Sequence, residues 1–95
     1  MATKKQSPKK SVLSPGAAVF IRTVTHNYIG RVVSVDDTFI TLEDAAWIAD
    51  SGRWAAALAT GSLSEVEPFP GECMVGIGAV VDVSPWAHTL PRETK

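Results

Sequence analysis

The stretch from Tyr28 to Trp54, YIGRVVSVDDTFITLEDAAWIADSGRW, decides the fold of this chain. Two runs in it, Tyr28 to Val35 and Phe39 to Glu43, are rich in β-branched and aromatic residues, which favours strands. A short acidic turn, Asp36-Asp37-Thr38, joins them. The second run leads without a linker into a segment of Ala, Trp, Ile and Gly, where an enzyme would place reactive side chains. This junction therefore favours a binding or assembly module.

The residues before this stretch extend the β pattern. Ala18 to Thr25 predicts a first strand, and His26-Asn27 predicts a hairpin tip because Asn tolerates positive φ. Phe39 to Glu43 is then the third strand of an antiparallel meander. Its alternation predicts that Ile40 and Leu42 lie on the buried face.

The chain beyond Asp44 is less regular. Ala45 to Ala49 fits either a short turn of helix or a broken strand. Ser51 is expected to cap a helix over residues 52–60 that ends at Gly61. Two further strands are expected at Leu63 to Phe69, on an edge, and at Cys73 to Val83, bent near Gly76 to Gly78. We expect Trp86 and Leu90 to anchor the C-terminal segment.

These elements predict a mainly β fold, a small five-stranded barrel of the SH3-like or Sm-like kind with one short helical insertion after the third strand. The pattern resembles Sm-like proteins at Gly30-x-Val32-x-x-x-Asp36, at Phe39-Ile40-x-Leu42-x-Asp44-Ala45, and at Gly78 followed by Val80-x-x-Val83-Ser84. The Asn and the Arg with which Sm-like proteins hold RNA are absent, since Ile40 and Thr41 stand at the first position and Ile77 at the second. The resemblance therefore implies a barrel and a tendency to form rings, without the RNA site.

The body of the chain also resembles small accessory proteins of tailed phages and prophages. The residues that carry this resemblance are Ile21 to Thr25, Asp44 to Arg53, Glu65 to Pro70 and Leu90 to Arg92. It implies an accessory protein that acts in a bacterial host cytoplasm or is built into a virion. It implies no particular activity.

Length and charge divide the chain into a basic tail and an acidic body. We expect a flexible basic tail over residues 1–16, a single small β-barrel domain over 17–91 and a C-terminal tail over 92–95. The basic tail carries Lys4, Lys5, Lys9 and Lys10 and lacks the apolar run of a signal peptide or membrane helix. Residues 11–91 hold three arginines and nine acids, a net charge of −6. The lysines would make salt-sensitive contacts with nucleic acid phosphate or an acidic neighbouring subunit, or serve only solubility.

The chemistry-bearing residues are too few and too scattered for catalysis. Cys73 is the single cysteine, which excludes an internal disulfide and fits a reducing cytosol. With only His26 and His88 beside it, no metal cluster is expected. No nucleophile or carboxylate pair has catalytic spacing. We therefore expect no enzymatic activity, no cofactor and no metal.

The candidate ligand-binding residues are Arg22, Arg31, Arg53, Trp47, Trp54 and Tyr28. Guanidinium groups bind phosphate, and aromatic rings stack on bases. Each has a structural alternative. Arg53 would pair with a nearby acid such as Asp50, the tryptophans would fill the core or a subunit interface, and the hairpin at His26 would be a solvated turn.

The leading functional hypothesis is a non-enzymatic, self-associating phage-type binding protein. As a homo-oligomer it would hold a nucleotide or nucleic acid at subunit junctions, and so sequester a signal of host defence in the host cytoplasm. The alternative is a structural or decorating virion component, anchored to other virion proteins by its N-terminal tail. A third possibility is a small adaptor for a host protein.

Overall fold

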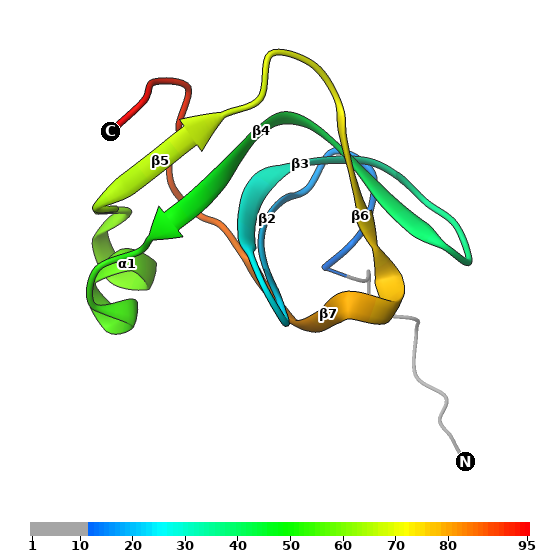
Figure 1. Ribbon diagram of the computed structural model, residues 1–95, viewed down its shortest axis with the longest axis horizontal. Coiled ribbons are helices and arrows are strands. Elements are labelled where there is room, and N and C mark those ends of the chain that lie inside the picture. The colour runs from blue at the N-terminus through cyan, green and yellow to red at the C-terminus, as the bar shows by residue number, and fades with distance from the viewer. Residues whose placement is uncertain (1–11) are drawn as a thin grey trace.

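The computed structural model describes residues 12–95; Lys4, Lys5, Lys9 and Lys10 lie outside the described range. The described part is mainly β, as predicted, with one α-helix after the third strand. The strands are β2 (Ala18–Thr23), β3 (Asn27–Val35), β4 (Phe39–Asp50), β5 (Glu65–Pro68), β6 (Cys73–Gly76) and β7 (Val80–Pro85). The helix α1 (Trp54–Thr60) lies between β4 and β5, and the 3-10 helix η1 (Ile77–Ala79) joins β6 to β7 (Figure 1).

The strands form one antiparallel sheet in the order β5-β4-β3-β2-β7, and β6 pairs with the first part of β4. The meander of β2, β3 and β4 is confirmed. The prediction of five strands is wrong, because the sheet has six. The last predicted strand bends near its glycines, as expected, but η1 divides it into two strands with different partners, β4 and β2. Hydrogen bonds do not close the sheet, so a closed barrel is not confirmed.

The long strand β4 changes partner at Asp44. Phe39 to Leu42 pair with β6, whereas Ala46 to Asp50 pair with β5. Asp44 has a φ of +48°, a value that residues other than glycine rarely adopt. Ala45 to Ala49 is therefore a strand after a kink, and the helical alternative is wrong. Pairing with β3 and β5 outweighs the helix propensity of the alanines.

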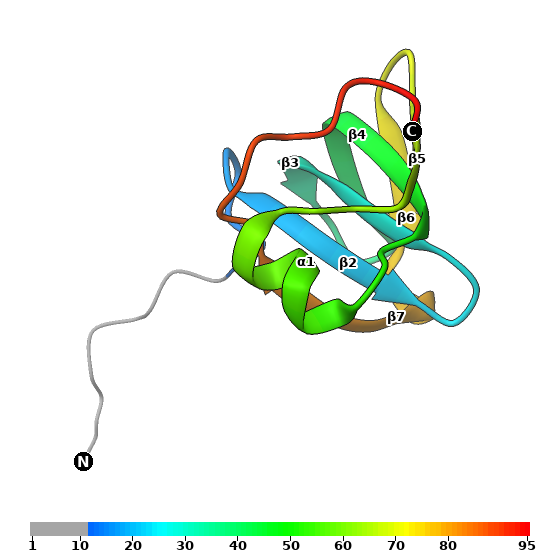
Figure 2. The ribbon, with the colours of Figure 1, turned by 90° about the vertical axis from the view of Figure 1, so that its left-hand side faces the viewer.

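The sheet is buried on both faces. The helix-side core lies under α1, which crosses β2 in Figure 2, and comprises Phe20, Ile29, Ala46, Ile48, Ala57, Leu63, Val66, Trp86 and Leu90. The second core comprises Val19, Ile21, Val32, Ile40, Leu42, Ala45 and Val75. Side chains alternate along β2, so Phe20 enters one core while its neighbours enter the other. The predicted burial of Ile40 and Leu42 is confirmed, as is the anchoring role of Trp86 and Leu90.

The ends of α1 match the sequence expectation on one side only. Arg53 occupies the N-cap position without a side-chain cap, so the predicted Ser51 cap is wrong; the Ser51 hydroxyl donates to the Gly52 carbonyl instead. The C-terminal stop at Gly61 is confirmed. Gly61 has a φ of +79°, and a Cβ there would lie 2.8 Å from His88. Only glycine fits this position.

The last residues of the chain contact the body. The Arg92 guanidinium lies 3.0 Å from the Asp44 carboxylate. The backbone of Lys95 exchanges two hydrogen bonds with Val66, each 3.0 Å long. Residues 92–95 thus run beside the edge strand β5.

Candidate functional site

Four aromatic side chains form a continuous row, which we call the aromatic row: Trp47, His26, Tyr28 and Phe69. Ring centroids are 5.2 Å apart for His26 and Trp47, 6.3 Å for His26 and Tyr28, and 6.2 Å for Tyr28 and Phe69. These spacings are typical of interacting aromatic pairs. His26 is exposed and the other three rings are half-buried. Each ring of the row therefore exposes part of its surface to solvent, while three of the four also pack against the protein.

The sheet register positions this row. Tyr28 on β3 lies directly opposite Trp47 on β4, so their side chains share a face. The Phe69 amide donates to the Ala45 carbonyl over 2.9 Å, which holds the chain after β5 beside β4. Tyr28 and Phe69 also pack against the second core. Three separate segments thus converge on one surface.

The hairpin tip at the end of the row is fixed by Thr23. Its hydroxyl donates to the His26 carbonyl over 2.7 Å and accepts a bond from the His26 amide over 2.9 Å. The Thr23 amide donates to the His26 carbonyl, so the tip lies at Val24-Thr25, two residues before the predicted tip at His26-Asn27, and Asn27 already belongs to β3. Because the backbone amide and the backbone carbonyl of His26 are both hydrogen-bonded, the turn holds the His26 ring in place.

The charge beside the row is negative. Glu67 on β5 lies opposite Trp47 in the β4 register and is exposed. Burial, and to a smaller extent the nearby Cys73, raise the pKa of the Tyr28 phenol. Tyr28 therefore stays neutral at pH 7 and keeps its hydroxyl proton. A ligand of this surface meets rings, a phenol and a carboxylate.

Arg22 and Trp54, two predicted ligand residues, meet on the helix side of the sheet. The Arg22 guanidinium carbon lies 5.1 Å from the Trp54 ring centroid, a cation–π distance. The same guanidinium forms a two-pronged ion pair with Asp82 on β7, with 2.8 Å between Arg22 Nε and Asp82 Oδ1. The hydrogen bond raises the pKa of Arg22 and lowers that of Asp82. Two of the three guanidinium nitrogens of Arg22, Nε and Nη2, thus already bond Asp82.

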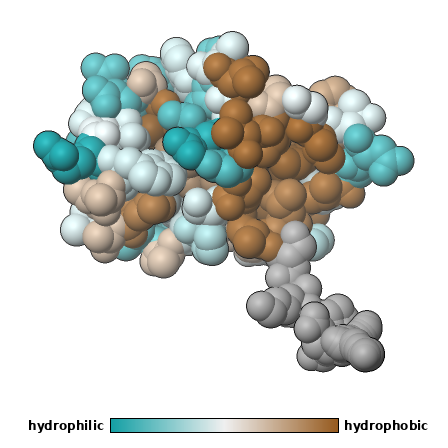
Figure 3. All heavy atoms as spheres, turned by 90° about the horizontal axis from the view of Figure 1, so that it is seen from below, coloured by the Kyte–Doolittle hydropathy of each residue, from teal (hydrophilic) through white to brown (hydrophobic). Residues whose placement is uncertain are grey.

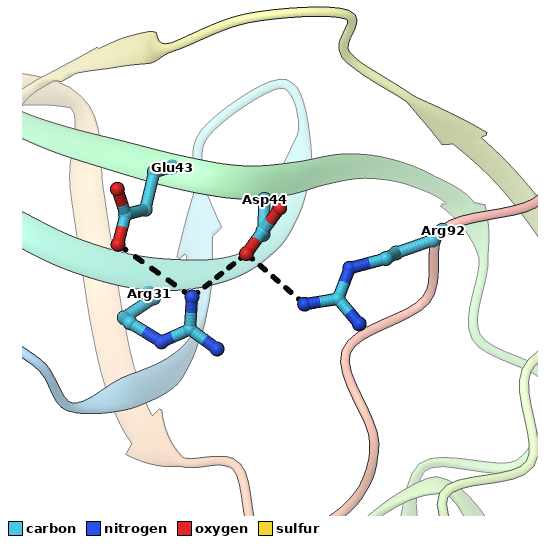
Figure 4. A network of polar contacts seen from close by, with 4 residues as sticks. All are labelled: Arg31, Glu43, Asp44 and Arg92. Carbon is cyan, nitrogen blue, oxygen red and sulfur yellow. Dashed lines mark hydrogen bonds and ion pairs between the residues drawn. The ribbon is translucent and has the colours of Figure 1, made fainter.

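Arg31 belongs to a separate ion-pair network, shown in Figure 4. Its Nη1 lies 2.7 Å from Asp44 Oδ2 and 3.5 Å from Glu43 Oε2, and Arg92 reaches the same Asp44 oxygen. Hydrogen bonds from Arg92 and then Arg31 lower the pKa of Asp44. The kink at Asp44 aims its carboxylate between the two arginines. The network holds two positive and two negative side chains. Through Arg92 it links the C-terminal segment to β3 and β4.

The six predicted ligand residues therefore do not form one site. Trp47 joins Tyr28, Arg22 joins Trp54, and Arg31 stands with carboxylates. Arg53 is exposed at the start of α1 and makes no ion pair with any residue in 12–95, whereas its expected partner Asp50 accepts the Gly52 amide. Sequence reasoning missed Phe69, Glu67 and Arg92. Aromatic and charged residue types were the only signals for them, since their contacts depend on distant pairing.

An apolar surface lies along β7, which we call the β7 patch: Val81 with Ile77, Val80 and Val83. Val81 is 60% exposed, and the other three are partly buried against the second core. Figure 3 shows a continuous apolar area on the lower side of the molecule, where η1 and β7 run in Figure 1. β7 is the last strand in the order of the sheet, so its outer edge pairs with no strand of residues 12–95. Sequence reasoning placed the strand here but missed its free edge.

Two grooves are lined by residues outside the aromatic row and the β7 patch. The first, between β5 and the C-terminal segment, includes Leu63, Leu90 and Lys95, and the second includes Val12, Ala18 and Pro85. Neither is lined by any of the six predicted ligand residues. In the described part of the chain, no three His, Cys, Asp or Glu side chains gather as a metal site would require. No helix there has the length and apolar character to cross a membrane.

Comparison with known proteins gives no match, whether to protein-family models, to curated proteins or to solved structures.

Proposed function

We propose that the protein is a non-enzymatic module that self-associates through the β7 patch and binds a partner through the aromatic row. The observation that carries the proposal is the apolar surface beside the free edge of β7, where Val81 is 60% exposed. Apolar patches at unpaired strand edges are sites of association, because both the side chains and the backbone groups gain partners. A 95-residue chain also gains stability by association, since it buries a modest share of its surface alone.

The fold supports a barrel-like form of this module. β6 continues through η1 into β7, and β7 pairs with β2 on the far side of the meander. The Ile77 amide donates to Thr38 and the Val24 amide to Ala79, so η1 is tied to both hairpins of the meander. We infer that the sheet curls around the second core as a small barrel of the SH3-like kind. Such barrels are frequent scaffolds of binding modules, an inference by analogy of fold.

Several groups support the absence of catalysis. Burial raises the pKa of the Cys73 thiol, which keeps it protonated and weakly nucleophilic at pH 7. Asp44 and Asp82 are engaged with arginines that lower their pKa values, so neither is poised as a general acid. These three groups thus support the non-enzymatic part of the proposal.

The bound partner and the biological setting are further parts of the proposal. Trp47 and Tyr28 offer ring faces for stacking on a base, whereas Arg53, at the start of α1, is not part of the aromatic row. A nucleotide at the row would therefore be held by stacking. A phage setting, in the host cytoplasm or in a virion, remains the hypothesis drawn from sequence. Nucleotide that co-purifies with the protein from cells would support a nucleotide-binding protein of the host cytoplasm. Particle attachment that depends on the N-terminal tail would support a virion component.

Sedimentation equilibrium of the full chain tests the self-association. We predict a reversible oligomer in which Val81→Asp raises the dissociation constant about tenfold or more, because burial of a valine contributes about 1.5–3 kcal/mol. Leu58→Asp is the matched control: Leu58 is 37% exposed and lies on α1, outside the β7 patch. A single-chain mass at every concentration contradicts the proposal, and so does equal weakening by both variants.

A further inference from the structure

We propose that the aromatic row binds the lysine-containing segment from Lys4 to Lys10 of a second copy of this chain. This inference rests on the proposed self-association and names one contact within it. It assigns a cationic peptide as the ligand of the row. It also gives the basic tail a partner.

The chemistry of the row selects a cation. The faces of Trp47 and Tyr28 attract ammonium groups through the negative ring quadrupole, and such contacts strengthen as water is excluded. Glu67 beside Trp47 adds a negative charge, which would repel a phosphate and attract a lysine. The row therefore favours a cationic ligand over an anionic one.

The charge distribution of the chain supplies that cation. Residues 12–95 hold five Lys and Arg against ten Asp and Glu, whereas residues 1–11 hold four lysines and no acid. Three of the five cations, Arg22, Arg31 and Arg92, are already paired with carboxylates. The tail lysines are thus the largest group of cations available to the acidic body of another copy.

The composition of the segment fits an aromatic surface. Pro8 stands between Lys5 and Lys9, and proline favours extended conformations that dock between exposed rings. An extended segment from Lys4 to Lys10 spans up to about 20 Å. This is close to the sum of the three centroid spacings along the row, 5.2, 6.3 and 6.2 Å.

A second copy is the occupant that the proposed self-association supplies. Val12 and Ala18 line one groove, so the described chain begins near the first residue of β2. Only the His26 end of the row lies beyond Thr23, the last residue of β2, because Tyr28 pairs with Ile21 inside the strand. Mixing labelled and unlabelled copies therefore decides whether the lysines of a neighbour or those of the same copy contact the row.

Zero-length crosslinking of the full chain tests this contact. Equal amounts of ¹⁵N-labelled and unlabelled protein are mixed, treated with a carbodiimide that joins lysine to carboxylate, digested and analysed by mass spectrometry. We expect peptides that join Lys4, Lys5, Lys9 or Lys10 to Glu67 in heavy–light pairs. The yield should fall with added salt, because the contact is electrostatic.

Trp47→Ala is the decisive variant, since it removes the ring and leaves the Glu67 carboxylate for the reagent. We expect about a tenfold lower heavy–light yield at Glu67, the effect of losing an interfacial tryptophan. Leu58→Ala, an exposed apolar change on α1, should leave the yield unchanged. Circular dichroism checks that both variants are folded, and Tyr28→Leu provides a second change in the row if Trp47→Ala is unfolded.

The outcomes separate this inference from the proposed function. An oligomer by sedimentation without heavy–light crosslinks to Glu67 overturns the tail contact and leaves self-association standing. A monomer overturns both. Crosslinks only within one isotope, or spread equally over exposed acids such as Asp37, contradict docking on a second copy. Photocrosslinking of a single-stranded oligonucleotide to Trp47, with no lysine–Glu67 product, would assign the row to nucleic acid instead.

Discussion

The two aromatic groups of this protein use the same residue types in opposite ways. On the helix side Phe20 is fully buried, with ring centroids 4.8 Å from Trp54 and 5.9 Å from Trp86. On the aromatic row, rings at similar spacings stay half-exposed around Trp47. The difference lies in the cover, because α1 and the C-terminal segment pack over the first group. Coverage therefore decides whether an indole stabilises the fold or is available to a partner.

The largest expected effect comes from the buried side of this comparison. Phe20→Ala should lower the free energy of unfolding by about 3–5 kcal/mol, because it removes the ring that contacts both Trp54 and Trp86. Trp47→Ala, the matched change on the row, should cost about 1 kcal/mol, since its ring is partly solvated already. Urea unfolding measures both. Equal losses in the two variants would erase the distinction between a core group and a binding group.

An intermediate effect is expected beneath the row, where β3 and β4 come close. A Cβ at Gly30 would lie 3.0 Å from the Ala45 Cβ and 3.1 Å from the Leu42 Cβ. Gly30→Ala should therefore cost about 1–3 kcal/mol through overpacking, and it should also displace Tyr28 and Trp47. Thermal unfolding measures the cost. Gly71→Ala, with no atom within 4 Å of the added Cβ, is the control and should be close to neutral.

The smallest effect concerns the surface ion pairs that fix the helix side. Arg22 lowers the pKa of Asp82, so the folded state holds this carboxylate ionised at a pH where the unfolded chain begins to protonate it. The stabilisation is present above about pH 4, the ordinary aspartate range, and is lost as the pH falls through the lowered folded pKa. The melting temperature should fall below pH 4, and less steeply in Asp82→Asn. A melting temperature that is flat or rises on acidification would contradict this linkage.

Local patterns in the sequence were sufficient for the meander, the buried face of Ile40 and Leu42, the helix stop at Gly61 and the bend near Gly76. Each of these depends on residues within a few positions of one another. The lengthening of β4 through the kink at Asp44, and the split of the last strand between two partners, depend on pairing with distant segments.

The candidate site divides in the same way. Tyr28 and Trp47 were identified by residue type, but their position opposite each other follows from the β3/β4 register. Phe69 and Glu67 join them only because β5 pairs with β4. Arg92 reaches Asp44 across 48 residues of sequence, which no local period records. Sequence alone named Arg22 and Arg31 as candidate ligand residues, but it could not show their carboxylate partners, which only the folded chain brings near.

The central claim is that the exposed surfaces serve other molecules, and the first of these is another copy of the chain. Sedimentation equilibrium of the unmodified protein tests it most directly. The account predicts a mass that rises with concentration to at least twice the chain mass of 10.1 kDa. A mass that stays at 10.1 kDa across the concentration range would contradict it.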